Sequence, residues 1–208
     1  MNAACRQTTL LNKYSQNNEQ EIILQHFGDR IGRFLDIGAF TGPDLSNVWA
    51  LLETGWSGVL VEPDPFNLVK LIEHARPFCK QATIVCAGLG PRRELIRLRM
   101  DETEGRRWAS SFVPHNPGVV VPSHDQVMVP VLPISDILSL GPFDFISIDA
   151  EWMDFDILKS LTHQDLDGCR MIIIETGGEE RQLFKDVLNQ LAFSVPCETP
   201  ENIIAVRT

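Results

Sequence analysis

The stretch FLDIGAFTG, residues 34–42, begins as an apolar strand and ends in a glycine-containing turn ahead of a helical pattern. Glycine permits a tight turn and lets a ligand approach the backbone closely. The start of a helix also offers free backbone N–H groups to an anion. The stretch therefore predicts a strand, a nucleotide-binding loop and a helix, with Asp36, Gly38, Ala39 and Gly42 as binding residues.

Dinucleotide-binding loops have the fingerprint G-x-G-x-x-G, whose second glycine corresponds to Phe40 in this chain. The bulk of Phe40 would obstruct a pyrophosphate, and the carboxylate of Asp36 favours a cationic ligand. Glu62 ends the next expected strand, ahead of Pro63, and its two oxygens can accept hydrogen bonds from both ribose hydroxyls. We expect Glu62 and Pro63 to complete a nucleoside site. The alternative is that Asp36 and Glu62 are solvated carboxylates at strand ends.

Strand-like and helix-like apolar patterns alternate along the chain, which is typical of a mostly parallel sheet with helices on both faces. We expect a single α/β domain over residues 1–208, doubly wound and closed by an antiparallel hairpin of residues 192–195 and 203–206. The other expected strands are 33–37, 58–61, 83–86, 95–100, 127–132, 143–148 and 171–174. The expected helices are 16–27, 44–54, 65–75, 154–161 and 179–190, with Asp64 capping the third.

Residues 101–126 interrupt this pattern and are rich in Pro, Gly, Ser and His. Loops of this length in compact domains are usually functional or disordered. We expect a substrate-side insertion, in which His115 or His124 could act as a base, although a solvated loop histidine is more common. Arginines in or just before the stretch could bind a phosphorylated acceptor, or form a solvated face beside neighbouring carboxylates: Arg92, Arg93, Arg97, Arg99, Arg106 and Arg107.

The chain has 208 residues and a net charge of −10. Nucleic acid is an improbable partner, because an acidic surface repels phosphate backbones. No apolar run approaches the length of a membrane span, and the polar start of the chain lacks the apolar core of a signal peptide. Five scattered cysteines without a CxxC pair indicate neither a zinc site nor a disulfide framework, so we expect a cytoplasmic protein.

Three carboxylates follow expected strands farther along the chain: Asp149 and Glu151 after one strand, and Glu175 after the next. Because open parallel sheets bind ligands at the carboxyl ends of their strands, these side chains should face one cleft. We expect Glu151 to act as a general base and Asp149 to orient the acceptor or the base. Alternatively, Glu151 caps the following helix. A magnesium ion on Asp149 and Glu175 is not favoured, because Thr176 replaces a further carboxylate or amide ligand.

Four segments together resemble FkbM-type methyltransferases, namely residues 15–19, 34–47, 52–65 and 143–151. The resemblance implies a Rossmann-like methyltransferase fold with an antiparallel last strand. It also implies methyl transfer from S-adenosylmethionine to a small-molecule or saccharide acceptor, usually at a hydroxyl group. Secondary metabolites are common acceptors in the family.

Family roles carry over to individual positions of this chain. By resemblance, Asp36, Gly38 and Gly42 form the loop on the methionine side of the cofactor. Glu62 is the ribose ligand, and Gln16 is a contact from an N-terminal lid.

The chain also departs from the family pattern. Phe40 replaces a small polar residue, and Trp152 replaces a glycine. The family's Asp near the adenine amino group is absent, and Ala87 and Gly88 lie in its place, so that hydrogen bond must come from the backbone or elsewhere. Two other functions stay open: an RNA methyltransferase, supported only by the arginines, and a nucleotide-binding module that has lost catalysis.

Overall fold

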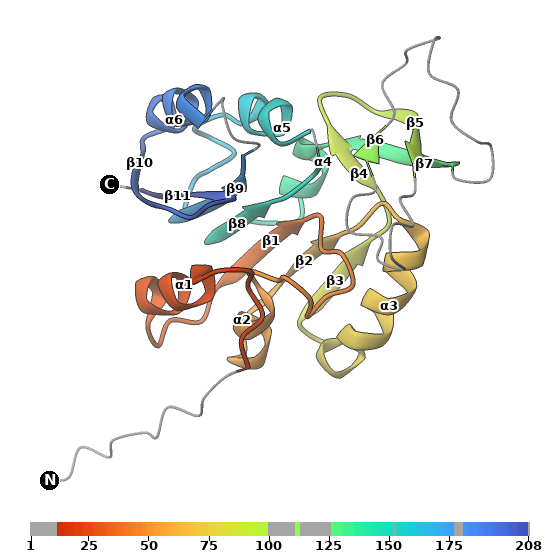
Figure 1. Cartoon of the computed structure of the whole chain (residues 1–208), viewed down its shortest axis with the longest axis horizontal. Coiled ribbons are helices and arrows are strands. Elements are labelled where there is room, and N and C mark those ends of the chain that lie inside the picture. The colour runs from red at the N-terminus through yellow and green to blue at the C-terminus, as the bar shows by residue number, and fades with distance from the viewer. Residues whose placement is uncertain (1–11, 100–110, 113–125, 152, 177–180, 208) are drawn as a thin grey trace, which may run out of the picture.

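The computed structural model describes residues 12–99, 111–112, 126–151, 153–176 and 181–207. At its centre is a seven-stranded sheet with the strand order β10-β11-β9-β8-β1-β2-β3 (Figure 1). These strands are β1 (Arg33–Ile37), β2 (Ser57–Val61), β3 (Ala82–Val85), β8 (Phe145–Ile148), β9 (Met171–Glu175), β10 (Phe193–Glu198) and β11 (Asn202–Arg207).

The strands from β9 to β3 run parallel to one another, with β1 between β8 and β2. β11 lies antiparallel between β9 and β10. The strand order reverses at the boundary between β1 and β8, which is where open α/β sheets bind ligands. The structure confirms the expected mostly parallel, doubly wound sheet with an antiparallel last strand.

Helices cover both faces of this sheet, and each face has its own buried apolar cluster (Figure 1). One cluster includes residues of α1 (Glu19–Phe27), α2 (Trp49–Glu53) and α3 (Pro65–Ala75), and the other includes residues of α4 (Ile134–Leu138), α5 (Asp154–Ser160) and α6 (Arg181–Gln190). A short 3-10 helix, η1 (Arg76–Phe78), follows α3. Side chains of β1 alternate between the clusters, with Phe34 in the first and Leu35 in the second.

A second, four-stranded sheet has the order β4-β7-β5-β6. It consists of β4 (Gly88–Gly90), β5 (Glu94–Arg99), β6 (Ser111–Phe112) and β7 (Gln126–Pro133). The strands expected at 95–100 and 127–132 are β5 and β7, which pair antiparallel with each other and not with the central sheet. β4 and α4 were not expected, because three residues of strand and five of helix are too short to show a period.

The helix after β1 differs from the expectation. It covers Trp49–Glu53 and not 44–54, because the Ser46 hydroxyl accepts hydrogen bonds from the N–H groups of Val48 and Trp49. Leu45 has a φ of 58°, a left-handed conformation that a helix cannot contain. The chain therefore reaches α2 through a long loop beside the end of β1.

The expected insertion at 101–126 lies outside the described residues, apart from residues 111–112 and 126. The proposed lid histidines, His115 and His124, fall in the part that is not described. None of the helices in the described ranges is both long and apolar enough to cross a membrane.

Candidate active site

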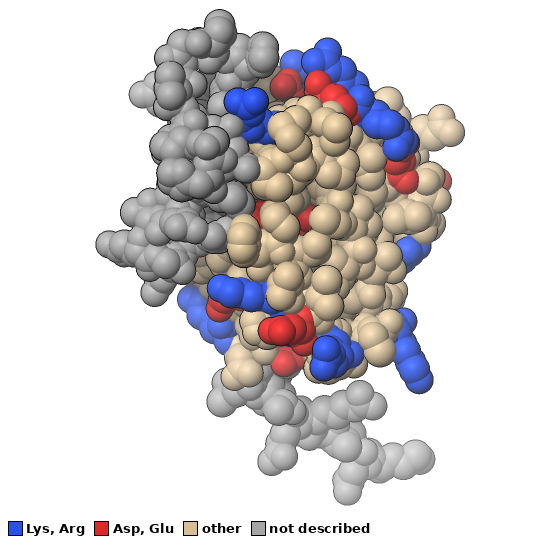
Figure 2. All heavy atoms as spheres, turned by 90° about the vertical axis from the view of Figure 1, so that its right-hand side faces the viewer, with Lys and Arg blue, Asp and Glu red and all other residues tan. Residues whose placement is uncertain are grey.

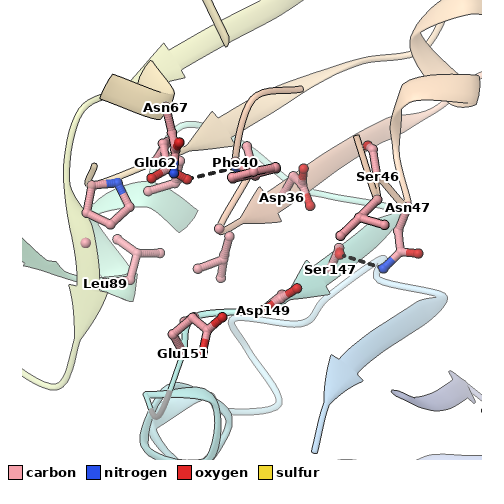
Figure 3. Close-up of a pocket in the computed structure, with 18 of the residues that line it drawn as sticks. Asp36, Phe40, Ser46, Asn47, Glu62, Asn67, Leu89, Ser147, Asp149 and Glu151 are labelled. Atoms are coloured by element: carbon pink, nitrogen blue, oxygen red, sulfur yellow. Dashed lines mark hydrogen bonds between the residues drawn. The ribbon is translucent and has the colours of Figure 1, made fainter. Parts of the chain in front are cut away.

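A cleft opens at the carboxyl ends of β1, β2 and β8, with about 880 Å³ of space between its walls, part of it open to solvent (Figure 3). Nine of the residues expected from the sequence line it: Asp36, Gly38, Ala39, Glu62, Pro63, Ala87, Gly88, Asp149 and Glu151. Two others do not. Gln16 is exposed elsewhere, and a side chain at Gly42 would meet Trp49 and Leu71 in the core. The position of Gly42 is explained by packing.

Gly38, directly after β1, lies against the backbone of Asp149, directly after β8. Its φ is +85°, and a Cβ built there would lie 1.7 Å from the carbonyl oxygen of Asp149. The N–H of Asp149 donates to the carbonyl of Ile37 at 2.9 Å. Only glycine fits this conformation and this approach, so Gly38 sets the position of Asp149 at the cleft.

Four backbone amides of the loop after β1 are bonded within the protein. Gly38 and Ala39 both donate to the carbonyl of Val61, and Gly42 donates to Ala39. Phe40 donates to the carboxylate of Glu62 at 2.8 Å. These four amides are therefore not free donors in this structure, and anion binding at the helix start stays a prediction. The loop joins β1 to β2.

Glu62 is 5% exposed and accepts a backbone hydrogen bond on each oxygen, from Phe40 and from Asp64, both at 2.8 Å. Burial raises its pKa to about 8, against the effect of these hydrogen bonds. The side chain of Asn67 also hydrogen-bonds to Glu62, so three of the roughly four acceptor positions of the carboxylate are used and one remains for a ligand hydroxyl. Glu62 is a fixed acceptor in the cleft wall and not a solvated strand end.

Asp36 is also buried, at 6% exposed, and burial raises its pKa to about 7, while a hydrogen bond with Ser147 lowers it. Ser147 in turn accepts a hydrogen bond from Asn47 at 3.3 Å (Figure 3). A buried carboxylate that is costly to ionise favours a positively charged ligand beside it. The cleft is therefore suited to a cation.

Three carboxylates meet on the β8 and β9 side of the cleft. Oxygens of Asp149, Glu151 and Glu175 all lie within 4.8 Å of one another, close enough to hold a cation between them. Enclosure by protein and repulsion from Glu175 raise the pKa of Asp149 well above its ordinary range, although its side chain is exposed through the cleft opening. Burial first, and then repulsion from Glu175, raises the pKa of Glu151 to about 7.

Asp149 and Glu151 share the cleft for a different reason than the expected strand alternation. β8 ends at Ile148, and Glu151 has a φ of 45°, so the segment turns and is not extended. The alternative role of Glu151 as a helix cap finds no support, because α5 begins at Asp154 without a side-chain cap. The carboxylate of Asp154 accepts instead from the N–H of Ala150, which fixes the turn.

Sequence reasoning missed several cleft residues, including Ser46, Asn47, Asn67, Leu89, Leu98 and Ser147. Two of these had a detectable signal. Asn67 is a polar residue on the buried side of amphipathic α3, and Ser147 interrupts an apolar strand. Leu98 had none, because it reaches the cleft from β5 of the second sheet, whose placement the sequence does not show.

Two of the arginines before the insertion are paired with carboxylates. Arg92 pairs with Glu94 at 3.0 Å, and Arg93 pairs with Asp136. Figure 2 shows basic side chains interleaved with acidic ones along the edge of one face, and some acidic atoms within its mostly tan centre. This arrangement agrees with a solvated face more than with a phosphate-binding surface.

Comparison with known proteins gives the class to which this fold and cleft belong. The model of the methyltransferase FkbM domain matches residues 36–195, and the chain belongs to this family. No match is found among curated protein sequences.

Among solved structures, the chain is similar to a methyltransferase FkbM from Methylobacillus flagellatus KT, with 18% identity and a TM-score of 0.57 over 85% of this chain and 43% of that one. It is also similar to monomeric WbdD, with 12% identity and a TM-score of 0.54 over 93% of this chain and 41% of that one. The chain thus spans less than half the length of either structure, and at these identities the likeness is one of fold.

Proposed function

We propose that the protein transfers a methyl group from S-adenosylmethionine to a hydroxyl of a small molecule, such as a saccharide or a secondary metabolite. The observation that carries this proposal is the cleft itself, in which the buried carboxylates of Asp36 and Glu62 end neighbouring parallel strands opposite the cluster of Asp149, Glu151 and Glu175. A site with this charge suits a nucleoside that carries a sulfonium cation.

The described residues fit S-adenosylmethionine part by part. Glu62 keeps an acceptor position for a ribose hydroxyl beside its bonds to Phe40, Asp64 and Asn67. Ala87, Leu89 and Leu98 give an apolar surface for the adenine, beside the backbone of Gly88. The cofactor would supply an electrophilic methyl group, and Asp36 lies where its carboxylate can offset the positive charge.

The acceptor hydroxyl must lose its proton when its oxygen attacks the methyl carbon. A base works best when its pKa lies near the working pH, and the pKa of Glu151 is about 7. We assign Glu151 to accept this proton, with Asp149 orienting the acceptor. The O–CH₃ bond then forms as the S–CH₃ bond breaks, and the proton ends on the Glu151 carboxylate.

The same three carboxylates could hold a divalent cation, which would acidify a bound hydroxyl and remove the need for a base. We favour the metal-free reading because Thr176 adds no carboxylate to the group. Activity that is lost in EDTA and restored by magnesium would assign the metal instead.

The cysteines of the described residues are free thiols, which supports a reducing compartment such as the cytoplasm.

The base assignment predicts the effect of Glu151→Gln. Turnover should fall by about 10²–10⁴-fold, the usual contribution of a positioned base, while affinity for S-adenosylhomocysteine stays within a few fold. The assay follows transfer of a deuterated methyl group from S-adenosylmethionine to a panel of sugars and hydroxylated metabolites by mass spectrometry. Asp156→Asn, on the exposed side of α5, is the matched control and should keep full turnover. Unchanged turnover in folded Glu151→Gln would remove Glu151 from the reaction.

A further inference from the structure

Glu19, at the start of α1, is a fully buried carboxylate outside the residues that match the family model. One of its oxygens accepts hydrogen bonds from Thr199 Oγ1 at 2.7 Å, Asn202 Nδ2 at 3.1 Å and Asn17 Nδ2 at 3.0 Å. The other accepts the backbone N–H of Asn17 at 2.8 Å. Burial alone would raise its pKa, but the hydrogen bonds from Thr199 and Asn17 leave the pKa below its ordinary value. Glu19 is therefore ionised at neutral pH.

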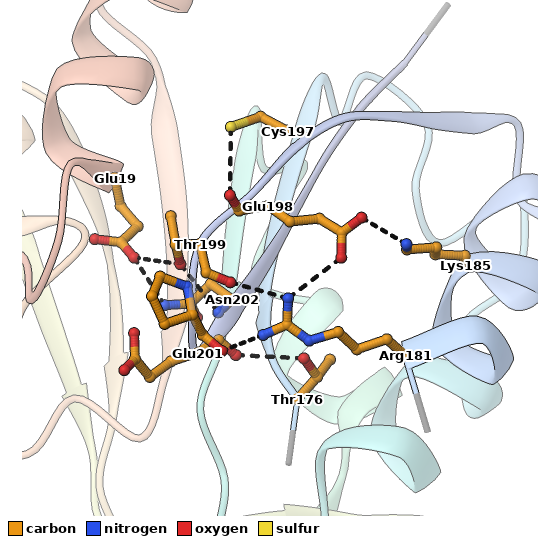
Figure 4. Close-up of polar contacts among 10 residues, drawn as sticks. Glu19, Thr176, Arg181, Lys185, Cys197, Glu198, Thr199, Glu201 and Asn202 are labelled. Atoms are coloured by element: carbon orange, nitrogen blue, oxygen red, sulfur yellow. Dashed lines mark hydrogen bonds and ion pairs between the residues drawn. The ribbon is translucent and has the colours of Figure 1, made fainter. Parts of the chain in front are cut away.

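Two of the donors to Glu19, Thr199 and Asn202, belong to residues 199–202, which connect β10 to the first residue of β11 and which we call the β10–β11 turn (Figure 4). The turn is closed by the N–H of Thr199 on the carbonyl of Asn202 and by the N–H of Asn202 on Thr199 Oγ1. On its other side, Arg181 of α6 donates to the carbonyls of Thr199, at 2.9 Å, and Pro200. The turn is thus held between α1 and α6.

The β10–β11 turn is bonded directly to the end of β9. The carbonyl of Glu201 accepts the N–H of Thr176 at 2.8 Å and its hydroxyl at 3.3 Å. Asn202, which donates to Glu19, also lies opposite Glu175 in the register of β11 and β9. Glu175 is the last residue of β9 and a member of the carboxylate cluster in the cleft. A continuous path of contacts therefore leads from Glu19 to the cleft.

We propose that Glu19 is a positioning residue, which fixes the β10–β11 turn and through it holds Glu175 against Asp149 and Glu151. The role of the cluster in methyl transfer rests on the proposed function. The effect of Glu19 on the position of Glu175 is independent of that function. The charge matters here, because an ionised carboxylate accepts from all of these donors at once. Glutamine has the same shape, but its NH₂ group cannot accept a hydrogen bond, so the donors that face this group would lose their acceptor.

The test uses Glu19→Gln in the full chain, with carboxyl groups of glutamate labelled with ¹³C. We expect the carboxyl resonance of Glu175, read at one fixed pH, to move away from its wild-type position. We also expect the amide of Thr176 to exchange with solvent about tenfold faster, which corresponds to about 1.4 kcal/mol of lost protection. Thr199→Val removes one donor to Glu19 and should move the same two signals, which keeps the test valid if Glu19→Gln does not fold.

Ile23→Val is the matched control, because Ile23 is buried one turn along α1 and its apolar side chain offers no hydrogen bond to the β10–β11 turn. It should lower stability and leave both Glu175 and Thr176 unchanged. If folded Glu19→Gln and Thr199→Val leave the Glu175 resonance in place, the positioning role is wrong and Glu19 only stabilises the fold. S-adenosylhomocysteine titrated into the wild type separates the two proposals. Failure to bind would overturn the proposed function without affecting the Glu175 result.

Discussion

Two acidic residues of the cleft, Asp36 and Glu62, are buried without a basic partner among the described residues. Hydrogen bonds from the backbone and from Ser147 compensate for only part of the lost hydration, so both residues keep raised pKa values. Burying a carboxyl group without a basic partner costs stability. Carboxyl groups with strongly shifted pKa values in a cleft therefore indicate function.

The raised pKa values predict how stability depends on pH. The pKa of Glu62 is about 8 in the folded protein and that of Asp36 is about 7, against ordinary values of 4.5 and 3.8. At pH values between the ordinary and the raised pKa of each group, the folded protein binds more protons than the unfolded chain. The free energy of unfolding should therefore fall as pH rises from about 5 to 8. Each group contributes at most about 1.4 kcal/mol per pH unit.

Urea denaturation between pH 5 and 8.5, without ligand, measures this slope. Glu62→Gln removes one titrating group and should flatten it. A free energy of unfolding that rises over this interval, or an equal slope in the variant, would show that Glu62 is ionised throughout in the folded state.

Gly38 offers a prediction with an internal control. Gly38→Ala places an alanine in a left-handed backbone conformation and also makes its Cβ clash with the carbonyl of Asp149. Gly168→Ala causes only the backbone strain, because nothing lies within 4 Å of its Cβ. We expect Gly168→Ala to cost about 1–2 kcal/mol of stability and Gly38→Ala clearly more, together with loss of ligand binding. Equal losses in the two variants, measured by urea denaturation, would mean that the approach of β1 to β8 is not tight.

At the scale of elements, the sequence predicts those helices and strands whose apolar pattern is bounded by clear capping or turn residues. α3 begins and ends where expected, because Pro65 follows the cap Asp64, which accepts from the N–H groups of Phe66 and Asn67. The strands of the central sheet were predicted to within a few residues for a similar reason, since each is a short apolar run between turn residues.

The elements that sequence could not predict depend on contacts between distant segments. The sequence does not show that β4 to β7 form a separate sheet, because the choice of pairing partner leaves no pattern in the local sequence. In the candidate site, the strand-end acids Asp36, Glu62, Asp149 and Glu151 could be found from their spacing. The bonded amides of the loop after β1 and the cleft position of Leu98 could not.

The late start of α2 leads to a further prediction. Ser46 lines the cleft and accepts from Val48 and Trp49, so Ser46→Ala should cost about 1 kcal/mol of stability, the usual net contribution of a hydrogen bond. Ser46→Asp keeps an acceptor and should retain most of it. Thermal unfolding of both variants gives the comparison, and wild-type stability of Ser46→Ala would contradict this account of where α2 begins.

At the scale of the whole molecule, the cleft is built by parts that the chain brings together from far apart. The central sheet supplies the acids, the second sheet supplies Leu98, and the N-terminal segment and the last hairpin meet behind Glu175. The family match covers residues 36–195, so Glu19 and the β10–β11 turn that it contacts both lie outside the matched region.

The central claim is that the cleft binds S-adenosylmethionine, and calorimetric titration tests it most directly. S-adenosylhomocysteine and NAD are titrated separately into the wild-type protein at pH 8, where Asp36 and Glu151, with pKa values of about 7, are largely ionised. We predict saturable binding of S-adenosylhomocysteine with one site per chain and no measurable binding of NAD, because Phe40 and the acids exclude a pyrophosphate. Saturable binding of NAD without any response to S-adenosylhomocysteine would contradict the account.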